Sequence, residues 1–320
     1  MNKKVVILGS GESAIGAAIL AKKLGYAVFV SDKNSMSSNA IQTLDNLDIE
    51  YESGGHDTQR LLAADLIIKS PGIPDHIPII QKLVTKNKEI ISEIEFGYRH
   101  SNGKIIAITG SNGKTTTTSL VYHILQKEGY DVALCGNIGK SFARVIAEEP
   151  KEWYVIELSS FQLDGCIQFK PHVAIICNIT EDHLDRYNYK FENYIQSKLS
   201  IAKNQTEDDY LIYCADDIVT TQYLHWIKSK VRKASFSLSQ PTEFGAYIKN
   251  EQLTINTDKQ IFTMSMDEFA LKGTHNTYNS MAAGIAAKLV GVRKATIRES
   301  LEDFESIEHR LEFVATIDGV

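Results

Sequence analysis

The stretch that decides the fold reads Ile105-Ile106-Ala107-Ile108-Thr109-Gly110-Ser111-Asn112-Gly113-Lys114-Thr115-Thr116. An apolar strand enters a turn bracketed by two glycines, and the turn ends in Lys-Thr where a helix begins. Such glycines let backbone N–H groups approach phosphate oxygens, and the amino end of the helix directs its positive dipole end at them. The lysine adds a point charge, and the threonine hydroxyl can ligate Mg²⁺. We therefore predict a triphosphate-binding loop built from Gly110, Ser111, Asn112, Gly113, Lys114, Thr115 and Thr116.

The turn departs from the strict G-x-x-x-x-G-K-S/T pattern, because Ile108 stands where that pattern has its first glycine. An ordinary glycine-rich turn between a strand and a helix is the alternative explanation. Strand, glycines, Lys and Thr nevertheless agree on one mechanism, which favours the phosphate site.

Length and composition bound the class of protein. The chain has 320 residues, so two domains or a little more are expected, and 43% hydrophobic residues suffice for packed cores. Its 34 basic and 40 acidic residues give a net charge of −6, without an overall basic footprint. Nucleic acid and anionic membranes are therefore not expected as partners, and the balance favours an enzyme acting on small molecules.

The cysteines and the N-terminus indicate the compartment. Cys135, Cys166, Cys177 and Cys214 are widely spaced and form no C-x-x-C pair, which suits free thiols in a reducing cytosol. The apolar run Val5–Leu8 is too short for a signal peptide, and no stretch approaches the roughly 18 apolar residues of a membrane span. We expect a cytoplasmic protein.

The first 90 or so residues alternate strand and helix patterns. A strand at Val5–Leu8 precedes a helix from about Ser13 to Leu24, and further apolar runs follow at Ala27–Val30 and Leu66–Ile68. Such alternation predicts a parallel sheet with right-handed crossovers, as in Rossmann-like α/β domains.

A glycine-rich turn follows the first strand. The segment Gly9-Ser10-Gly11-Glu12-Ser13-Ala14, with Asp32 about 20 residues further on, matches the dinucleotide fingerprint G-x-G-x-x-G/A. The match places a helix amino end near a phosphate and Asp32 near a ribose or base. It does not say which nucleotide is bound, so a nicotinamide-dependent oxidoreductase remains a possible reading at this point.

A second α/β unit begins near Ile105. Its P-loop helix runs from Thr115 to about Lys127, and short alternating runs between Glu243 and Met266 predict a small antiparallel flank. The expected parallel strands are Ile105–Thr109, Val132–Leu134, Tyr154–Leu158, Val173–Ile176 and Tyr210–Tyr213, and the expected late helices are Thr277–Val290 and Ala295–Phe304.

The segment Arg310–Val320 reads as one strand that enters a hairpin turn and stops. A strand needs a pairing partner, so we expect the chain to be cut just inside a third domain.

Further polar residues follow the predicted strands of the second unit. Glu157 and His183 each come after a strand and should reach the carboxyl edge of the sheet, where P-loop proteins keep their metal carboxylate. Lys198 lies in an expected helix, and Asn276 and Asn279 lie one turn apart at a helix start, where they could read an adenine edge. Singly, each has an ordinary structural explanation. Together with the P-loop they favour a site for metal and phosphate.

The combination of these motifs resembles the Mur ligases. The residues that carry the resemblance are Gly110–Thr116, Gly136-Asn137-Ile138-Gly139, Glu157-Leu158-Ser159-Ser160-Phe161-Gln162-Leu163, Thr180-Glu181-Asp182-His183-Leu184-Asp185-Arg186-Tyr187, His275-Asn276 with Asn279, and His309-Arg310. Within the family, the Glu157–Leu163 segment is similar to that of the ligases that add D-glutamate to UDP-N-acetylmuramoyl-L-alanine in peptidoglycan precursor synthesis.

The resemblance implies a domain order. In the family, three domains bind the UDP moiety, ATP and the incoming amino acid. It implies a Rossmann-like UDP-binding domain over residues 1–92, an ATP-binding central domain over residues 93–306, and a stub of the amino-acid domain over residues 307–320. A chain of this extent is expected to bind the UDP-sugar and ATP without being active alone, and to be monomeric.

The resemblance also assigns substrate contacts. The N-terminal fingerprint becomes a site for uridine diphosphate, although Ala14 stands where the family usually has glycine. The implied UDP contacts are Gly11, Glu12, Ser13, Asp32, Lys33 and Gly72. Asn137 and Ser159 are expected to orient the muramoyl-alanine arm.

The resemblance implies an ATP site with two Mg²⁺ ions. Thr115 and Glu157 would hold one ion and His183 the second, and the family's lysine, here Lys198, is carbamylated, which makes it an anionic oxygen ligand suited to Mg²⁺. Asn276 and Asn279 would face adenine. Arg310 would approach the phosphates.

Two other functions stay open on the sequence alone. A nicotinamide-dependent oxidoreductase would use Gly9–Ala14 and Asp32 but leaves the P-loop unit unexplained. A non-catalytic nucleotide-binding module is the second alternative.

Overall fold

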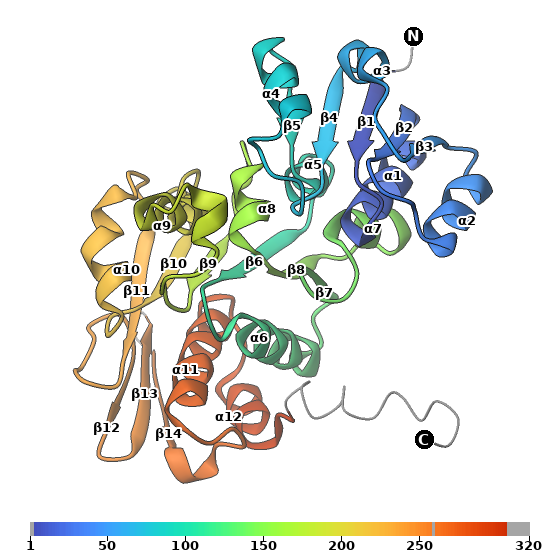
Figure 1. The fold of residues 1–320 in the computed structure, drawn as a ribbon. Helices are drawn as coiled ribbons and strands as arrows, with labels where there is room; N and C mark the ends of the chain where they lie inside the picture. Colours follow the sequence, from blue (N-terminus) through green and yellow to red (C-terminus); the bar gives the residue numbers. More distant parts are fainter. Residues whose placement is uncertain (1–2, 258–259, 306–320) are drawn as a thin grey trace, which may run out of the picture.

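A computed structural model describes residues 3–257 and 260–305 and contains two α/β units (Figure 1). The first is a five-stranded parallel sheet in the order β3-β2-β1-β4-β5. Its elements are β1 (Lys4–Leu8), α1 (Glu12–Lys23), β2 (Ala27–Asp32), α2 (Ser38–Asn46), β3 (Glu50–Ser53), α3 (Thr58–Ala63), β4 (Leu66–Lys69), α4 (Pro78–Thr85) and β5 (Ile90–Ile91). The apolar runs of β1 and β4 are buried, as expected for strands covered by helices.

The second unit is a nine-stranded sheet in the order β14-β13-β12-β11-β10-β9-β6-β8-β7. Its strands are β6 (Lys104–Thr109), β7 (Val132–Gly136), β8 (Trp153–Glu157), β9 (Val173–Ile176), β10 (Tyr210–Cys214), β11 (Arg232–Ser237), β12 (Gly245–Lys249), β13 (Gln252–Thr257) and β14 (Gln260–Ser265). The strands from β7 to β12 pair in parallel, and β12 to β14 pair antiparallel. The predicted α/β class with an antiparallel flank is confirmed, and the flank continues the main sheet.

Helices cover the nine-stranded sheet and lead into the candidate site. The α-helices of this unit are α5 (Glu93–Arg99), α6 (Lys114–Glu128), α7 (Phe142–Glu148), α8 (Ser160–Asp164), α9 (Phe191–Leu199), α10 (Ile218–Tyr223), α11 (Thr274–Leu289) and α12 (Lys294–Asp303). Short 3₁₀ turns are η1 (Leu184–Tyr187), η2 (Ser200–Ala202), η3 (Leu224–Trp226) and η4 (Met266–Glu268). Helix α6 begins directly after the P-loop, as predicted.

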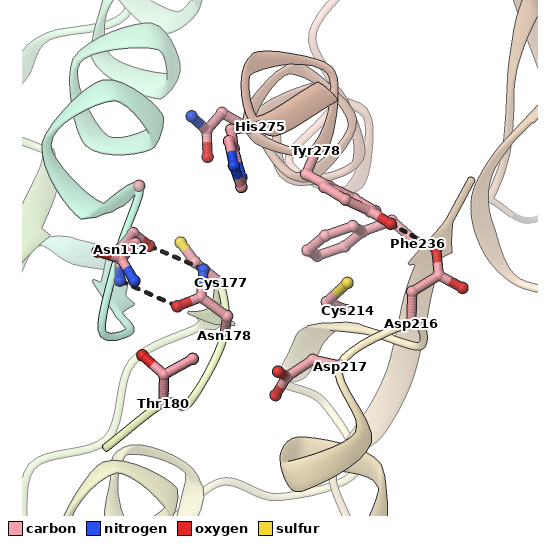
Figure 2. Close-up of a pocket in the computed structure, with 12 residues that line it drawn as sticks. Asn112, Cys177, Asn178, Thr180, Cys214, Asp216, Asp217, Phe236, His275 and Tyr278 are labelled. Atoms are coloured by element: carbon pink, nitrogen blue, oxygen red, sulfur yellow. Dashed lines mark hydrogen bonds between the residues drawn. The ribbon is translucent and has the colours of Figure 1, made fainter. Parts of the chain in front are cut away.

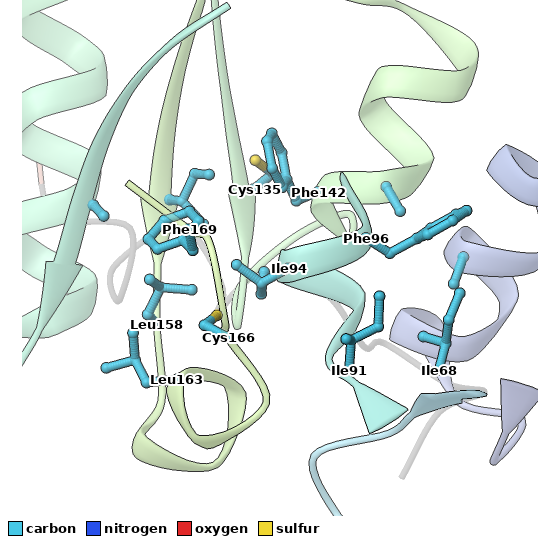
Figure 3. Packing of buried hydrophobic residues seen from close by; sticks show 14 of the residues in the cluster. Ile68, Ile91, Ile94, Phe96, Cys135, Phe142, Leu158, Leu163, Cys166 and Phe169 are labelled. Atoms are coloured by element: carbon cyan, nitrogen blue, oxygen red, sulfur yellow. The ribbon is translucent and has the colours of Figure 1, made fainter. Parts of the chain in front are cut away.

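The two sheets share one hydrophobic core through α5 and α7 (Figure 3). Ile68 and Ile91 of the first sheet, Phe96 of α5 and Phe142 of α7 belong to one buried cluster. Gly16 of α1 faces α7 so closely that a Cβ atom there would lie 1.9 Å from Ser141 Oγ. The close approach of α1 and α7 joins the two units.

Two carboxylates meet the amino end of α7 at this junction. Glu12 of α1 accepts a hydrogen bond from the Ser141 backbone N–H over 3.0 Å. Glu93 of α5 is 2% exposed and accepts one from the Ala143 N–H over 2.5 Å, while its Oε2 has no hydrogen-bond partner among the residues that the structure describes. Burial raises the pKa of Glu93 to about 8. Both acids supply oxygen acceptors for backbone N–H groups that a helix amino end leaves without partners inside the helix.

Some predictions lie outside the described residues. These are the C-terminal strand from Arg310, the stub at 307–320 and Arg310 itself. The domain boundaries at 92 and 306 stay a prediction. Among residues 3–257 and 260–305, every helix is too short or too polar to cross a bilayer.

Candidate functional site

The P-loop follows β6, an interior strand of the nine-stranded sheet that pairs with β8 on one side and with β9 on the other. Gly113 has φ +80° and is the N-cap of α6, so the cap residue has no side chain to bond the first N–H groups of the helix. A side chain at Gly113 would also place Cβ 2.5 Å from Asn279 Oδ1. The helix amino end is thus kept open for an anion by a glycine that backbone conformation and space both require.

Asn178 holds the first half of the loop. The Ser111 N–H donates to the Asn178 carbonyl over 2.9 Å, and the Asn112 N–H donates to Asn178 Oδ1 over 2.9 Å. Lys114 Nζ donates to the carbonyls of Gly110 and Ser111, each over 3.0 Å. The lysine therefore lies across the loop, within reach of a phosphate bound there.

Glu157 and Thr115, the two residues predicted to share one Mg²⁺, are hydrogen-bonded to each other. Thr115 Oγ1 donates to Glu157 Oε2 over 2.8 Å, and Asn137 Nδ2 donates to Glu157 Oε1 over 2.8 Å. Glu157 is 1% exposed at the carboxyl end of β8. A buried carboxylate beside a P-loop hydroxyl is a donor set that suits Mg²⁺.

Lys198 of α9 is buried at the same place. It is 2% exposed, its Nζ donates to the Gly110 carbonyl over 2.7 Å, and it lies 4.6 Å from the centroid of the Tyr194 ring. Burial, reinforced by the nearby charge of Lys114, lowers the pKa of Lys198 to about 7. The sequence alone could not exclude a solvated lysine, and the structure places this one in the interior.

His183 lies in the loop after β9, with φ +51° and a side chain that is 54% exposed. Its ring centroid is 5.1 Å from that of Phe161, and Nε2 lies 3.4 Å from Asp182 Oδ2. A small cavity of about 230 Å³ contains His183 in its wall; its lining residues are Pro71, Gly72, Lys114, Asn137, Ser159, Ser160, Phe161, Asp182, His183, Tyr194 and Lys198. We refer to it as the reaction cavity.

A second cavity of about 530 Å³ opens beside the P-loop (Figure 2). Its lining residues are Asn112, Gly113, Cys177, Asn178, Thr180, Cys214, Asp216, Asp217, Phe236, His275, Tyr278 and Asn279. Figure 2 shows the Tyr278 and Phe236 rings facing Asn112 across the space. We call this the base cavity, because flat apolar rings beside a phosphate loop suit a nucleotide base.

The two predicted adenine readers differ in position. Asn279 lines the base cavity, whereas Asn276 does not. The Asn276 amide donates to the Lys272 carbonyl over 3.0 Å, and its Oδ1 accepts a long 3.4 Å hydrogen bond from Asn279. Any role of Asn276 in reading a base would act through Asn279.

A third cavity of about 630 Å³ lies at the carboxyl edge of the five-stranded sheet. We call it the N-terminal cavity. Its walls include the predicted UDP contacts Gly11, Glu12, Ser13, Asp32, Lys33 and Gly72, together with Asn137. Asp32 accepts hydrogen bonds from Ser10 Oγ over 2.6 Å and from the Asn34 N–H over 2.9 Å, so its carboxylate is fixed at the end of β2.

Two predicted substrate contacts have their side chains engaged within the protein. The Glu12 carboxylate lies 2.8 Å from Arg144 Nε in addition to its hydrogen bond with Ser141. Ser159 forms a capping box with Gln162 at the start of α8. A contact of Glu12 with diphosphate would therefore use its backbone N–H, which also keeps the negative side chain from facing phosphate.

Several lining residues were missed from the sequence. Asp216, Asp217 and Tyr278 of the base cavity and His56 of the N-terminal cavity had no assigned role. The Asp216-Asp217 pair comes one residue after the end of β10, so its position after a parallel strand was a usable signal. Among the described residues, no group of three or more His, Cys, Asp and Glu side chains could hold a metal ion; the predicted ligands are a mixed set with Thr115 and Lys198.

Comparison with known proteins identifies the family. The Mur ligase middle domain matches residues 108–287, and the MurD-like N-terminal domain of Mur ligases matches residues 3–92. The chain belongs to the Mur ligase family. It is 51% identical over 320 residues to the UDP-N-acetylmuramoylalanine--D-glutamate ligase of Christiangramia forsetii, covering 100% of this chain and 72% of that protein. The protein of that name from Bacteroides thetaiotaomicron is 47% identical over 318 residues, covering 99% and 71%.

Solved Mur ligase structures share the fold. UDP-N-acetylmuramate:L-alanyl-gamma-D-glutamyl-meso-diaminopimelate ligase from Neisseria meningitidis gives a TM-score of 0.65 at 20% identity, covering 95% of this chain and 99% of that one. UDP-N-acetylmuramate-alanine ligase from Thermotoga maritima gives a TM-score of 0.57 at 21% identity, covering 95% and 69%. Mur ligases use ATP and Mg²⁺. Neither the oxidoreductase nor the non-catalytic module receives support from these comparisons.

Proposed function

We propose that this Mur ligase joins D-glutamate to UDP-N-acetylmuramoyl-L-alanine with conversion of ATP to ADP. The observation that carries the proposal is the order of the three cavities. The N-terminal and reaction cavities share Pro71, Gly72 and Asn137, while the P-loop separates the reaction cavity from the base cavity. A sugar nucleotide and ATP bound at the two ends would bring their reactive ends together in the middle.

The chemistry uses positioning and charge. The alanine carboxylate of the substrate attacks the γ-phosphorus of ATP and ADP leaves, which gives an acyl phosphate; the amine of D-glutamate then displaces phosphate from the acyl carbon. Lys114 and the open amino end of α6 stabilise charge on the phosphates, as in other phosphoryl transfers. Asn137 and Ser159 line the reaction cavity and are proposed to orient the muramoyl-alanine arm.

Mg²⁺ fits the oxygen atoms that the structure brings together. We propose that Thr115 and Glu157 hold one ion and that His183, with Lys198 as a carbamate, holds a second. When bound, the ions neutralise phosphate charge. Asn137 keeps the Glu157 carboxylate oriented by its hydrogen bond to Oε1.

Carbamylation of Lys198 is chemically reasonable at this position. The neutral Nζ attacks the carbon of CO₂, an N–C bond forms, and a proton leaves to solvent. With a pKa lowered to about 7, a large share of Lys198 is neutral at physiological pH. The product is an anionic oxygen donor in the wall of the reaction cavity.

We also propose that residues 1–92 and 93–306 act as the UDP-binding and ATP-binding domains. The five-stranded sheet ends with β5 at Ile91, and the described part of the ATP-binding unit runs from α5 to α12. We propose a cytoplasmic monomer.

The proposed reaction is tested by its first half. The chain is incubated with UDP-N-acetylmuramoyl-L-alanine, Mg²⁺·ATP and bicarbonate, with hydroxylamine present to trap an acyl phosphate as its hydroxamate. We expect ADP and hydroxamate to form only when the sugar nucleotide is present. ADP formation that does not depend on the sugar nucleotide, or no ADP at all, would contradict the proposal. Because a chain of this extent is expected not to complete the ligation alone, the amino acid is tested by giving D-glutamate, L-glutamate or L-alanine, in place of hydroxylamine, to a version extended to the length of its relatives.

A further inference from the structure

Arg186 bridges the two units behind the reaction cavity. It lies in η1, three residues after His183, and belongs to the nine-stranded unit. Its Nη2 donates to the Pro71 carbonyl over 3.1 Å and its Nη1 to the Gly72 carbonyl over 3.4 Å, across 115 and 114 residues of sequence. Pro71 and Gly72 follow β4 of the five-stranded sheet and line both the N-terminal and the reaction cavities.

The same guanidinium is stacked on an aromatic side chain. Its carbon lies 4.3 Å from the centroid of the Phe161 ring, and that ring is 5.1 Å from the ring of His183 and 5.9 Å from that of Tyr187. Arg186 does not line the reaction cavity or the N-terminal cavity. Arg186 therefore contacts residues that line the reaction cavity, Pro71, Gly72 and Phe161, without lining that cavity itself.

Arginine is suited to this position. Its planar, permanently charged fork can donate to two backbone carbonyls while its face packs on an aromatic ring, which lysine cannot do at once. Charge-assisted hydrogen bonds to carbonyl groups are stronger than neutral ones. The contact ties the Pro71-Gly72 turn to the loop that carries His183.

We propose that Arg186 is a positioning residue that couples the sugar-nucleotide site to the Mg²⁺·ATP site. The inference rests on the proposed function. A ligand in the N-terminal cavity holds the Pro71-Gly72 turn, and the turn, through Arg186 and Phe161, holds the His183 loop. Binding of one substrate then favours the loop arrangement that the other needs, and the coupling is reciprocal.

The test compares the unmodified chain with Arg186→Ala and Arg186→Lys. Arg298→Ala is a matched control, because Arg298 also lies over an aromatic ring, that of Phe262, and donates to a backbone carbonyl, that of Thr263, away from all three cavities. Calorimetry measures the dissociation constants of UDP-N-acetylmuramoyl-L-alanine and of Mg²⁺·AMP-PNP, each alone and with the other at saturation.

We expect the unmodified chain and Arg298→Ala to bind each ligand several-fold more tightly when the other is present. In both Arg186 variants, the ratio of the dissociation constants measured without and with the other ligand should fall to about one. The sugar nucleotide should also bind about tenfold more weakly, as loss of charge-assisted hydrogen bonds predicts. Mg²⁺·AMP-PNP alone should bind within twofold of the unmodified chain. A variant that only destabilised the fold would bind both ligands more weakly, and for each ligand the ratio of the dissociation constants without and with the other would stay the same.

An unchanged ratio in Arg186→Ala would overturn the inference, as would absence of coupling in the unmodified chain. Failure of the unmodified chain to bind the sugar nucleotide at all would instead contradict the proposed function. Arg186→Lys keeps a cation at the position and serves if Arg186→Ala does not fold.

Discussion

Thr115 donates its hydroxyl hydrogen to Glu157 Oε2 over 2.8 Å, which joins the first turn of α6 to the end of β8. The two side chains come from elements 42 residues apart in sequence. Because Asn137 binds the other carboxylate oxygen, Glu157 is held in one orientation before any metal arrives. Preorganised oxygen atoms at the end of a P-loop are what phosphoryl transfer with Mg²⁺ requires.

Lys114→Ala should lower the sugar-nucleotide-dependent rate of ADP formation by about 10²- to 10³-fold, because it removes a charge aimed at the transferred phosphate. Binding of UDP-N-acetylmuramoyl-L-alanine should be unchanged, since the N-terminal cavity does not contain this lysine. The control is Lys127→Ala at the far end of the same helix, where Lys127 pairs with Asp303. A Lys114→Ala rate close to that of the control would show that the P-loop interpretation is wrong.

Gly113→Ala should abolish Mg²⁺·ATP binding, whereas Gly129→Ala should not. Both glycines flank α6 and have positive φ, +80° and +93°, so alanine costs about 1–2 kcal/mol of stability at each. At Gly113 the new Cβ would lie 2.5 Å from Asn279 Oδ1, whereas at Gly129 no atom of residues 3–257 and 260–305 lies within 4 Å of it. Thermal unfolding should show a similar loss of stability in the two variants. Calorimetry should show that Gly129→Ala binds Mg²⁺·AMP-PNP and that Gly113→Ala does not. If Gly113→Ala and Gly129→Ala bound Mg²⁺·AMP-PNP equally well, the P-loop would not need glycine at position 113 to bind nucleotide.

Lys198 should take up CO₂. In ¹³C-bicarbonate, the chain should show a carbamate carbon signal that Lys198→Arg abolishes and that Lys190→Arg, a change at an exposed lysine just before α9, keeps. Because the pKa of Lys198 is lowered to about 7, the neutral amine increases as pH rises through 7, and the signal should increase from pH 6 to pH 8. A signal that survives Lys198→Arg would refute this assignment.

Glu93→Gln should change the pH dependence of stability. Burial raises the pKa of Glu93 from 4.5 to about 8, so the folded state keeps a proton that the unfolded state releases between these values. The unmodified chain therefore loses stability as pH rises from about 5 to about 8, by at most about 1.4 kcal/mol per pH unit from this group.

Urea unfolding at pH 5, 6, 7 and 8 measures the effect. As pH rises, the free energy of unfolding of Glu93→Gln should increase relative to that of the unmodified chain. The free energy of unfolding of Glu207→Gln, a change at an exposed position, should change with pH as that of the unmodified chain does. A constant difference between Glu93→Gln and the unmodified chain over this range would show that Glu93 is ionised in the folded protein.

The strands that could be predicted are those with a strong burial signal. The runs Val5–Leu8 and Ile105–Thr109 are apolar because parallel strands are covered on both faces, and they became β1 and β6. β3 (Glu50–Ser53) and β11 (Arg232–Ser237) were not predicted, since their polar sequences resemble loops and only pairing with a neighbour makes them strands.

The candidate site shows a similar division. Residues at the carboxyl ends of strands lie where phosphate and nucleotide sites were expected, because the carboxyl ends of parallel strands share one edge. Asp32 ends β2 and lines the N-terminal cavity, and Glu157 ends β8 and is hydrogen-bonded to Thr115 after the P-loop. Contacts between distant segments could not be predicted from local sequence. The bond between Glu12 and Ser141, 129 residues apart, and the bridge from Arg186 to Pro71 exist only because the two sheets pack together.

One chain is proposed to hold a sugar nucleotide and ATP at separate sites, the N-terminal and base cavities. Calorimetric titration with UDP-N-acetylmuramoyl-L-alanine, before and after saturation with Mg²⁺·AMP-PNP, tests it most directly, with NAD⁺ as the competing ligand. We expect the sugar nucleotide to bind at one site per chain in both titrations, Mg²⁺·AMP-PNP to bind at a second site, and NAD⁺ not to bind. Binding of NAD⁺ without the sugar nucleotide, or displacement of the sugar nucleotide by Mg²⁺·AMP-PNP, would contradict it.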